Sequence, residues 1–287
     1  MANETLLASA LFAIAAAAVY AYVGSRVGRR RVSRDAQLAS RLFTMWWYGL
    51  AATTAVGAAQ SVLAWGGALD LPLALTLAQV NLLMVSVALW GLLYYLAYVF
   101  TGKSRALWPI SAFYVVNYVL LVYFVAVSAP QAVHVGRWSA TLEYGNPQGG
   151  PLLAAVVLLL LGPQIGSGLA YFTLFFKVRE PTQRWRIALV SLSIVAWFGS
   201  ALAGVGAGLS QHDWWQWTTR GIGLAAALTI LMAYVPPLWA RRKWGIQPLD
   251  DGPQPLPQAA PPAPLPAPAP PPAPREVARE PPGPPPP

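Results

Sequence analysis

The chain has no cysteine, two histidines and three lysines among its 287 residues. Without cysteine it forms no disulfide and offers no thiolate to a metal or a substrate. Both histidines, His134 and His212, lie outside the longest apolar segments, which excludes a haem ligated by histidine inside a helical bundle. The lysines also lie outside these segments, so none is placed to hold retinal as a Schiff base. We therefore expect a protein that is not an enzyme and carries no cofactor and no metal.

Charged side chains are scarce as well, since they make up 10% of the chain and hydrophobic residues make up 56%. A soluble domain carries about 25% charged residues. All ten acidic residues lie between the apolar segments or at their ends. Proton pumps and ion-coupled carriers usually place ionisable groups in mid-membrane. The composition therefore predicts an integral membrane protein and gives no support to an ion-coupled carrier.

Seven apolar stretches are long enough to cross a bilayer as helices, which takes about 20 residues for a hydrocarbon core of roughly 30 Å. The stretches are residues 5–24, 43–66, 72–100, 107–128, 152–176, 187–209 and 219–240. We therefore predict an all-α, polytopic membrane domain over residues 1–246, with seven transmembrane helices in contact with the lipid bilayer.

The basic residues predict the orientation of these helices, because short cytoplasmic loops carry an excess of Lys and Arg. Fifteen basic residues follow the first, third, fifth and seventh spans, whereas the loops on the other side hold only Arg137 and Arg220. This pattern places the N-terminus outside and the C-terminus in the cytoplasm, as expected for a multi-pass protein of the inner cell membrane. The net charge of +9 is then a topology signal, and we expect no nucleic-acid partner.

Two patterns indicate how the spans meet their surroundings. Trp46 and Trp47 lie near a predicted span end and are typical of an aromatic belt at the level of the lipid head groups. Gly162, Gly166 and Ala170 are spaced by four, which predicts a face for close helix packing.

Four amides at membrane depth, Gln60, Gln79, Asn81 and Gln164, need hydrogen-bond partners, because an unsatisfied amide in hydrocarbon costs several kcal/mol. They have two interpretations. The side chains pair with one another between helices, or they line a ligand-binding cavity open to the outside. The first interpretation is the commoner one for such residues, and the second gains some support from Gln60, Gln79 and Asn81, which fall in the outer halves of their spans.

The longest external loop, residues 129–151, is long for a plain connection. It contains His134, Arg137 and Trp138, and a second cluster of charged and aromatic residues precedes and opens the last span. The members of that cluster are His212, Asp213, Arg220 and the tryptophans between them. We consider two roles for the loop, a simple interfacial segment and a lid that closes over a bound ligand.

Two basic and aromatic segments face the cytoplasm in this topology. One is Arg184, Trp185 and Arg186, and the other is the triplet Arg241, Arg242 and Lys243 after Pro236-Pro237. Such segments anchor a protein at the head-group surface. The alternative is that they relay a movement of the bundle to a cytoplasmic partner.

Residues 247–287 are built mainly of proline, with 19 of the 28 prolines in residues 248–287. A segment of this composition buries no core and populates extended polyproline II. We predict a disordered cytoplasmic tail, which serves as a spacer or as a docking site for a proline-binding partner.

The run Thr182-Gln183-Arg184-Trp185-Arg186 leads into the sixth predicted span, which contains Trp197-Phe198. With the seven-span topology, these residues resemble the seven-helix sensor regions of bacterial receptor histidine kinases. The resemblance implies a bacterial membrane receptor. This chain differs by having no kinase domain, so the resemblance implies an output through a separate protein.

These observations favour a non-enzymatic membrane sensor or receptor that acts through a separate cytoplasmic partner, reached through its basic loops or its proline-rich tail. A permease for a small neutral or hydrophobic solute is the first alternative. A membrane scaffold or assembly protein is the second. A receptor predicts one external pocket and a filled inner half, whereas a permease predicts polar lining that continues past mid-membrane.

Overall fold

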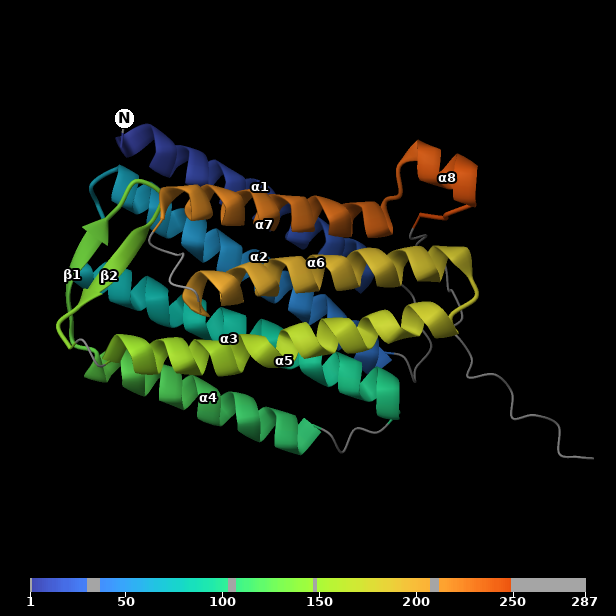
Figure 1. Ribbon diagram of the computed structural model, residues 1–287, viewed down its shortest axis with the longest axis horizontal. Helices are drawn as coiled ribbons and strands as arrows, with labels where there is room; N and C mark the ends of the chain where they lie inside the picture. Colours follow the sequence, from blue (N-terminus) through green and yellow to red (C-terminus); the bar gives the residue numbers. More distant parts are fainter. Residues whose placement is uncertain (1, 30–36, 103–106, 147–148, 207–211, 249–287) are drawn as a thin grey trace, which may run out of the picture. The chain divides into compact units, whose positions relative to one another are not determined.

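The structure is a computed structural model, and it describes residues 2–29, 37–102, 107–146, 149–206 and 212–248. Over these residues the chain forms eight α-helices and one two-stranded β-hairpin (Figure 1). The helices are α1 (Ala2–Gly28), α2 (Gln37–Trp65), α3 (Leu71–Thr101), α4 (Leu107–Val127), α5 (Gly149–Lys177), α6 (Pro181–Gly206), α7 (Asp213–Tyr234) and α8 (Leu238–Trp244). Most of the predicted proline-rich tail, from residue 249 onward, lies outside the described residues.

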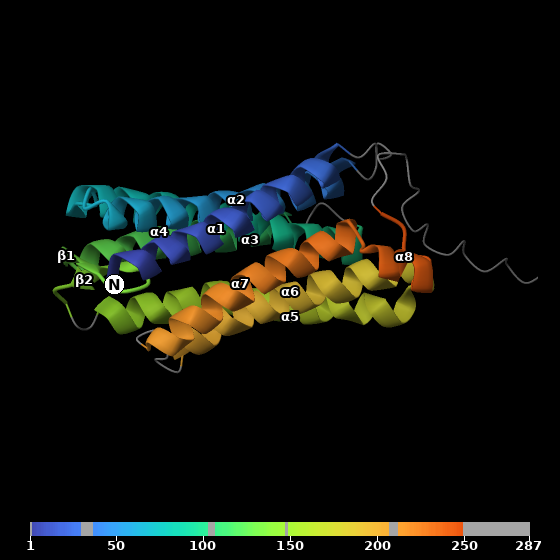
Figure 2. The same cartoon turned by 90° about the horizontal axis from the view of Figure 1, so that it is seen from above.

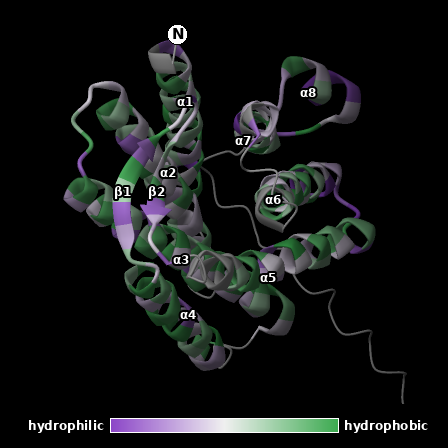
Figure 3. Cartoon of the chain, turned by 60° about the vertical axis from the view of Figure 1, so that its left-hand side comes forward, coloured by the Kyte–Doolittle hydropathy of each residue, from purple (hydrophilic) through white to green (hydrophobic). Residues whose placement is uncertain are grey.

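Six of the long helices form a closed ring. Helix α1 contacts α2, α2 contacts α3, α3 contacts α5, and α5, α6 and α7 follow in order until α7 returns to α1. Helix α4 packs against α3 and α5 (Figure 3). Figure 2 shows the closing contact, with α1 beside α7. The ring therefore brings the first and last long helices of the chain side by side.

The bounds of α3 follow from its local sequence. The Asp70 carboxylate accepts a hydrogen bond from the backbone N–H of Leu73 at 2.9 Å, which caps the first turn. Pro72 lies in that turn, where its missing N–H costs nothing. At the other end Gly102 adopts a left-handed conformation with φ 65°, which glycine allows without strain.

Five helices are long and apolar enough to cross a membrane, namely α1, α3, α4, α5 and α6 over the described residues. The number rises to six when α7 and α8, which meet at a bend of 49°, are taken as one span. The chain is therefore mostly helical, as predicted, and consistent with a multi-pass membrane protein. Helix α2 has the length of a span, with 29 residues, but it is less apolar than these five helices because its interior contains polar side chains such as Thr53 and Gln60.

The surface of α4 is unusually apolar for a face that contacts no other part of the described chain. Val115, Val116 and Val119 are 58% to 62% exposed. A soluble protein rarely leaves such a contiguous row uncovered. These side chains suit contact with lipid.

The segment between α4 and α5, which was predicted to be an external loop, contains a β-hairpin, so the all-α prediction is wrong at this point. Strand β1 (Pro130–Val135) pairs antiparallel with β2 (Ala140–Tyr144). Residues such as Val133, Val135 and Thr141 favour strands because their branched side chains suit a pleated surface. The search for 20-residue apolar stretches could not detect two strands of this length. Figure 3 shows hydrophilic residues on this hairpin and on α8.

The hairpin and the start of α1 lie at one end of the ring, here called the hairpin end, and α8 lies at the other (Figure 1). The Thr5 hydroxyl of α1 donates to the carbonyl of Arg137 at 2.6 Å. The amide of Gln60, near the end of α2, donates to the carbonyl of Ala140 at 3.3 Å. These two bonds fix the hairpin against α1 and α2.

The half of the ring toward α8 is filled by a core of aromatic and aliphatic side chains, here called the aromatic core. Trp46 and Trp47 are only 1% and 0% exposed, and their rings lie 4.0 Å apart between centroids. Phe43 packs against both, and Tyr234 of α7 packs against Trp47. The prediction of an aromatic belt at Trp46 and Trp47 is therefore wrong, because these rings turn into the bundle.

The predicted packing face on α5 is also displaced. A Cβ atom added at Gly162 or Gly166 would meet nothing within 4 Å, and Ala170 is exposed. The close approach is at Gly168, where an added Cβ would lie 2.8 Å from Ile194 of α6. Spacing alone did not reveal which side of α5 faces α6.

Candidate ligand-binding cavity

A partly enclosed cavity of about 220 Å³ lies inside the ring, between α1, α2, α3, α6 and α7. It is here called the central cavity. It is lined by Ser9, Phe12, Ala13, Ala16, Tyr20, Thr53, Thr54, Gly57, Ser61, Asn81, Trp197, Thr219, Arg220, Gly223 and Leu224. Helices from both ends of the described chain, α1 to α3 and α6 to α7, contribute to it, so its closure depends on the contact between α7 and α1.

Among the described residues that line the cavity, Arg220 alone is charged. It is partly buried, and its Nε donates a hydrogen bond to the hydroxyl oxygen of Ser9 on α1 at 2.8 Å. No carboxylate lies within ion-pair distance of Arg220 among the described residues. An arginine stays charged in a protein. The cavity therefore holds one positive charge that no described acidic side chain balances.

Two oxygen atoms in the cavity lining also lack a hydrogen-bond partner within the described part of the chain. They are Oδ1 of Asn81 on α3 and Oγ1 of Thr53 on α2. Both atoms are buried, and buried polar atoms in folded proteins are normally satisfied. The lining residues therefore include one cation that no described acidic side chain balances and two residues with a buried, unpaired oxygen.

An aromatic stack covers the hairpin end of the cavity. Trp138, between the two strands, is 2% exposed and lies 4.2 Å from Trp217 of α7 between ring centroids. Trp217 in turn contacts Phe12 of α1 at 6.3 Å, and Phe12 lines the cavity. The tip of the hairpin is thus packed against the cavity wall through two aromatic rings.

Tyr20 and Trp197 separate the cavity from the aromatic core. Their ring centroids are 6.1 Å apart, and the other side of Tyr20 stacks on Trp47 at 6.3 Å. Tyr20 is 1% exposed. The polar lining thus gives way to closely packed rings toward α8.

Among the four amides predicted for a cavity, Asn81 alone lines it. Gln164 is fully buried and donates to the hydroxyl of Tyr114, so it joins α5 to α4. Gln60 holds the hairpin, as described above, and Gln79 is partly buried away from the cavity lining. Gln164 therefore matches the alternative prediction of hydrogen bonding between helices, whereas Gln60 bonds to the hairpin, which neither interpretation included.

Of the external residues predicted to bind a ligand, some lie at the cavity and others lie elsewhere. Arg220 lines the cavity and Trp138 covers it, whereas the backbone of Arg137 binds Thr5. His134 Nδ1 lies 3.3 Å from Glu143 Oε1 on the exposed face of the hairpin. The remaining two residues begin α7: His212 is exposed, and the side chain of Asp213 lies outside the described residues.

The two predicted cytoplasmic segments meet each other at the α8 end. Trp185 of α6 packs against Trp239 and Trp244 of α8 at 5.8 and 5.3 Å between ring centroids. We call these three residues the tryptophan triad. The neighbouring Arg186 donates to the carbonyl of Gln247 at 3.2 Å. The sequence predicted the two segments separately, and the fold joins them.

Four basic side chains lie near the triad: two contact aromatic rings, one donates a hydrogen bond to a backbone carbonyl, and one is exposed. Arg184 lies over the ring of Phe175 at 4.3 Å, and Lys243 lies over Trp244 at 5.8 Å. The Nε of Arg241 donates to the carbonyl of Pro236 at 2.8 Å, which fixes the bend before α8. Arg242 is exposed.

Several lining residues were not predicted as part of a site, above all Ser9, Phe12, Tyr20 and Trp197. Apolar and small residues of this kind occur throughout the spans, so nothing in the sequence distinguishes the ones that face a cavity. Ser9 and Arg220 are separated by more than two hundred residues. Only the closure of the ring brings them together.

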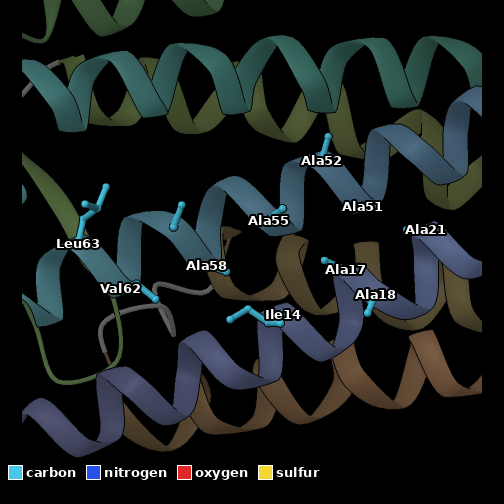
Figure 4. A pocket seen from close by; sticks show the side chains of 11 residues that line it. Ile14, Ala17, Ala18, Ala21, Ala51, Ala52, Ala55, Ala58, Val62 and Leu63 are labelled. Carbon is cyan, nitrogen blue, oxygen red and sulfur yellow. The ribbon is translucent and has the colours of Figure 1, made fainter.

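A second hollow, larger and apolar, lies between α1 and α2 (Figure 4). It is lined by alanines and a few larger aliphatic residues, such as Ile14 and Val62, with no charged side chain. It is an open groove rather than an enclosed cavity. Its chemistry suits lipid chains and offers no specific contact for a polar ligand.

The chain matches no protein-family model, and a search of curated proteins finds no relative.

Proposed function

We propose that this protein is a non-enzymatic membrane receptor that binds a small ligand in the central cavity and acts through a separate cytoplasmic partner. The observation that carries the proposal is the contrast between the two halves of the ring. The hairpin half contains a polar cavity with Arg220, and the α8 half is filled by the aromatic core. A receptor needs such a closed floor, whereas a permease needs a polar path through both halves.

The proposal includes seven spans, with α2 and α7 crossing the membrane beside the five apolar helices. Helix α2 has 29 residues, which extend about 43 Å at 1.5 Å per residue. It packs against α1 and α3, and its tryptophans turn into the bundle, so polar content does not prevent it from spanning. Helix α7 closes the ring between α1 and α6.

The orientation follows from where the charges lie. Arg184, Arg241 and Lys243 are at the α8 end, as is the basic residue Lys177 at the end of α5. The positive-inside rule then places α8 in the cytoplasm and the hairpin outside. In this orientation the central cavity lies in the external half of the ring, beneath the hairpin.

Helix α7 connects the cavity to the cytoplasmic face. It carries Arg220 near its start, continues to Tyr234 in the aromatic core, and bends into α8. The tryptophan triad and the bond from Gln247 N–H to the Thr182 hydroxyl tie α8 to the start of α6. A shift of α7 on ligand binding therefore reaches the cytoplasmic loop between α5 and α6.

Flux through the purified protein in liposomes tests the receptor against a permease. We expect butyrate, glycerol, alanine and glucose to enter these vesicles no faster than protein-free vesicles. Fast and saturable uptake of any of them would overturn the receptor proposal.

Fluorescence at α8 tests the link along α7. Because the chain has no cysteine, Arg242→Cys provides a single site for a bimane dye, which neighbouring tryptophans quench. We expect Arg220→Gln to change the bimane intensity in the full chain, and the matched change Glu143→Gln on the exposed hairpin face to leave it unaltered. Equal intensities in all three proteins would contradict a relay.

A further inference from the structure

We infer that the central cavity binds a small organic carboxylate, held by the terminal nitrogens of Arg220. This inference rests on the proposed receptor function, because it names the class of ligand for the same cavity. It follows from three features of the lining, which are the charge of Arg220, the edge of its guanidinium that remains available, and the size and apolar walls of the space around it.

The charge of Arg220 calls for an anion. A partly buried guanidinium without an acidic partner among the described residues has lost part of its solvation, and a counter-charge compensates for this loss more strongly than a neutral group does. Ser9, its one hydrogen-bond partner in the described chain, is neutral. The other groups of the lining are hydroxyls, one amide and hydrocarbon. A ligand that brings a negative charge is therefore favoured over a neutral one of the same shape.

The geometry of the guanidinium favours a carboxylate. Its Nε is occupied by the Ser9 hydroxyl at 2.8 Å, whereas its two terminal nitrogens have no acceptor among the described residues. Two terminal N–H groups form parallel hydrogen bonds to the two oxygens of a carboxylate. The bond to Ser9 also fixes the plane of the group, which leaves less side-chain freedom to lose on binding.

The remaining lining limits the body of the ligand. A volume of about 220 Å³ corresponds to about seven water molecules at roughly 30 Å³ each, so the ligand is small. Phe12, Tyr20, Trp197 and Leu224 supply apolar walls. A single arginine suits a monoanion better than a phosphate dianion.

Ligand-induced stabilisation of the full chain in lipid nanodiscs tests the inference, because a bound ligand raises the unfolding temperature. The probes are butyrate, benzoate and lactate at constant ionic strength, each compared with its neutral amide. We expect the carboxylates to raise the unfolding temperature and the amides to leave it unchanged. Equal shifts for acids and amides, or no shift with any acid, would overturn the inference.

Substitutions at one residue locate the site. We expect Arg220→Gln to weaken carboxylate binding by about 30-fold or more, because it removes one partner of a buried charge pair. Arg220→Lys keeps the charge but loses the paired geometry, so we expect a smaller loss of about tenfold. The matched control is Arg242→Gln on the exposed face of α8, which should bind as the unsubstituted protein does. Unchanged binding in both Arg220 variants would place the carboxylate elsewhere and overturn the assignment.

Two further probes separate the sources of an anion. Sulfate tests for an inorganic ion, and dodecanoate tests for a lipid-derived acid whose chain exceeds the cavity. Binding of either at Arg220 as strong as that of butyrate would overturn the assignment of a small organic acid.

These experiments distinguish failure of the carboxylate inference from failure of the receptor proposal. If no carboxylate binds and the vesicles stay impermeable, the ligand class is wrong and the receptor proposal stands. If butyrate binds through Arg220 and also crosses the membrane, the ligand class stands and the receptor proposal fails.

Discussion

The two halves of the helical ring use aromatic side chains in opposite ways. Toward α8, Phe43, Trp46 and Trp47 pack ring against ring between the helices. Toward the hairpin, Phe12 and Trp197 stand beside hydroxyls and an arginine around a cavity. Both arrangements leave buried polar atoms without a partner among the described residues, the indole nitrogens of Trp46 and Trp47 in the first and oxygens of Thr53 and Asn81 in the second. The difference is that the first is closely packed, whereas the second surrounds a space next to a charged side chain.

This contrast teaches that the composition of a helix does not show what its side chains do. Helix α2 contributes to both halves, with Trp46 and Trp47 in the aromatic core and Thr53, Thr54 and Gly57 in the cavity. About two turns separate the two functions. The same helix therefore offers matched positions at which the contrast can be tested.

The largest effect is expected for Trp47→Ala in the aromatic core. Loss of a fully buried ring leaves a cavity, and such changes cost about 3 to 5 kcal/mol. Reversible unfolding in mixed detergent micelles measures the free energy. Trp65→Ala, on the same helix but at a ring that is 43% exposed, is the control and should cost far less. Equal losses of unfolding free energy in the two variants would contradict a closely packed aromatic core centred on Trp47.

The second effect has the opposite sign and concerns Arg220→Gln without ligand. Because the arginine carries a charge with no acidic partner among the described residues, its replacement should raise the free energy of unfolding by about 2 kcal/mol. Chemical unfolding of the ligand-free protein measures this change. A loss of stability would show that the guanidinium is satisfied in the folded protein and would weaken the case for a binding cavity.

Two glycines on α2 provide a direct comparison of packing. An added Cβ at Gly49 would lie 2.6 Å from the Cβ of Ala88 on α3, whereas one at Gly57 would meet nothing within 4 Å. We expect Gly49→Ala to destabilise the protein by about 1 to 2 kcal/mol through overpacking. Gly57→Ala should stabilise it by up to about 1 kcal/mol, because alanine favours a helix. Unfolding curves of the two variants, measured side by side, test this comparison. Changes in unfolding free energy of the same sign in both variants would contradict the assignment of a filled half and a half with a cavity.

The smallest effect is expected on the exposed face of the hairpin. His134 and Glu143 are 62% and 57% exposed, and exposed ion pairs contribute about 0 to 1 kcal/mol. We therefore expect Glu143→Gln to change stability by less than about 0.5 kcal/mol and to leave carboxylate binding unaltered. A large loss of binding in the thermal assay would place His134 and Glu143 in the site after all.

Hydropathy and length predicted most of the helices because each helix satisfies its own backbone. The end of α3 at Gly102 and the bend after α7 at Pro236-Pro237 are encoded locally, by glycine and proline. The hairpin was missed because its two strands are short and its pairing joins residues across a turn. The burial of Trp47 was missed because a tryptophan near a span end suits an interface as well as a core.

For the candidate site, the sequence grouped Arg220, Asn81 and Trp138 with seven other residues as candidates for external ligand binding, without indicating which of the ten lie at one cavity. It also named Gln164 and His134, which the fold places elsewhere, on Tyr114 and on Glu143. Polar residues in apolar segments are recognisable as exceptions, but their partners are not. A hydrogen bond such as that from Arg220 to Ser9 depends on how α7 is placed against α1.

By itself the sequence determined that the chain has membrane composition, that it forms long apolar helices and that its acidic residues lie outside them. These properties depend on composition and on neighbours along the chain. Only the tertiary structure decided that the helices close into a ring, which half of the ring is filled and which half holds Arg220 beside unpaired oxygens. Those properties depend on the rotation of each helix about its axis, which is set by packing against helices distant in sequence.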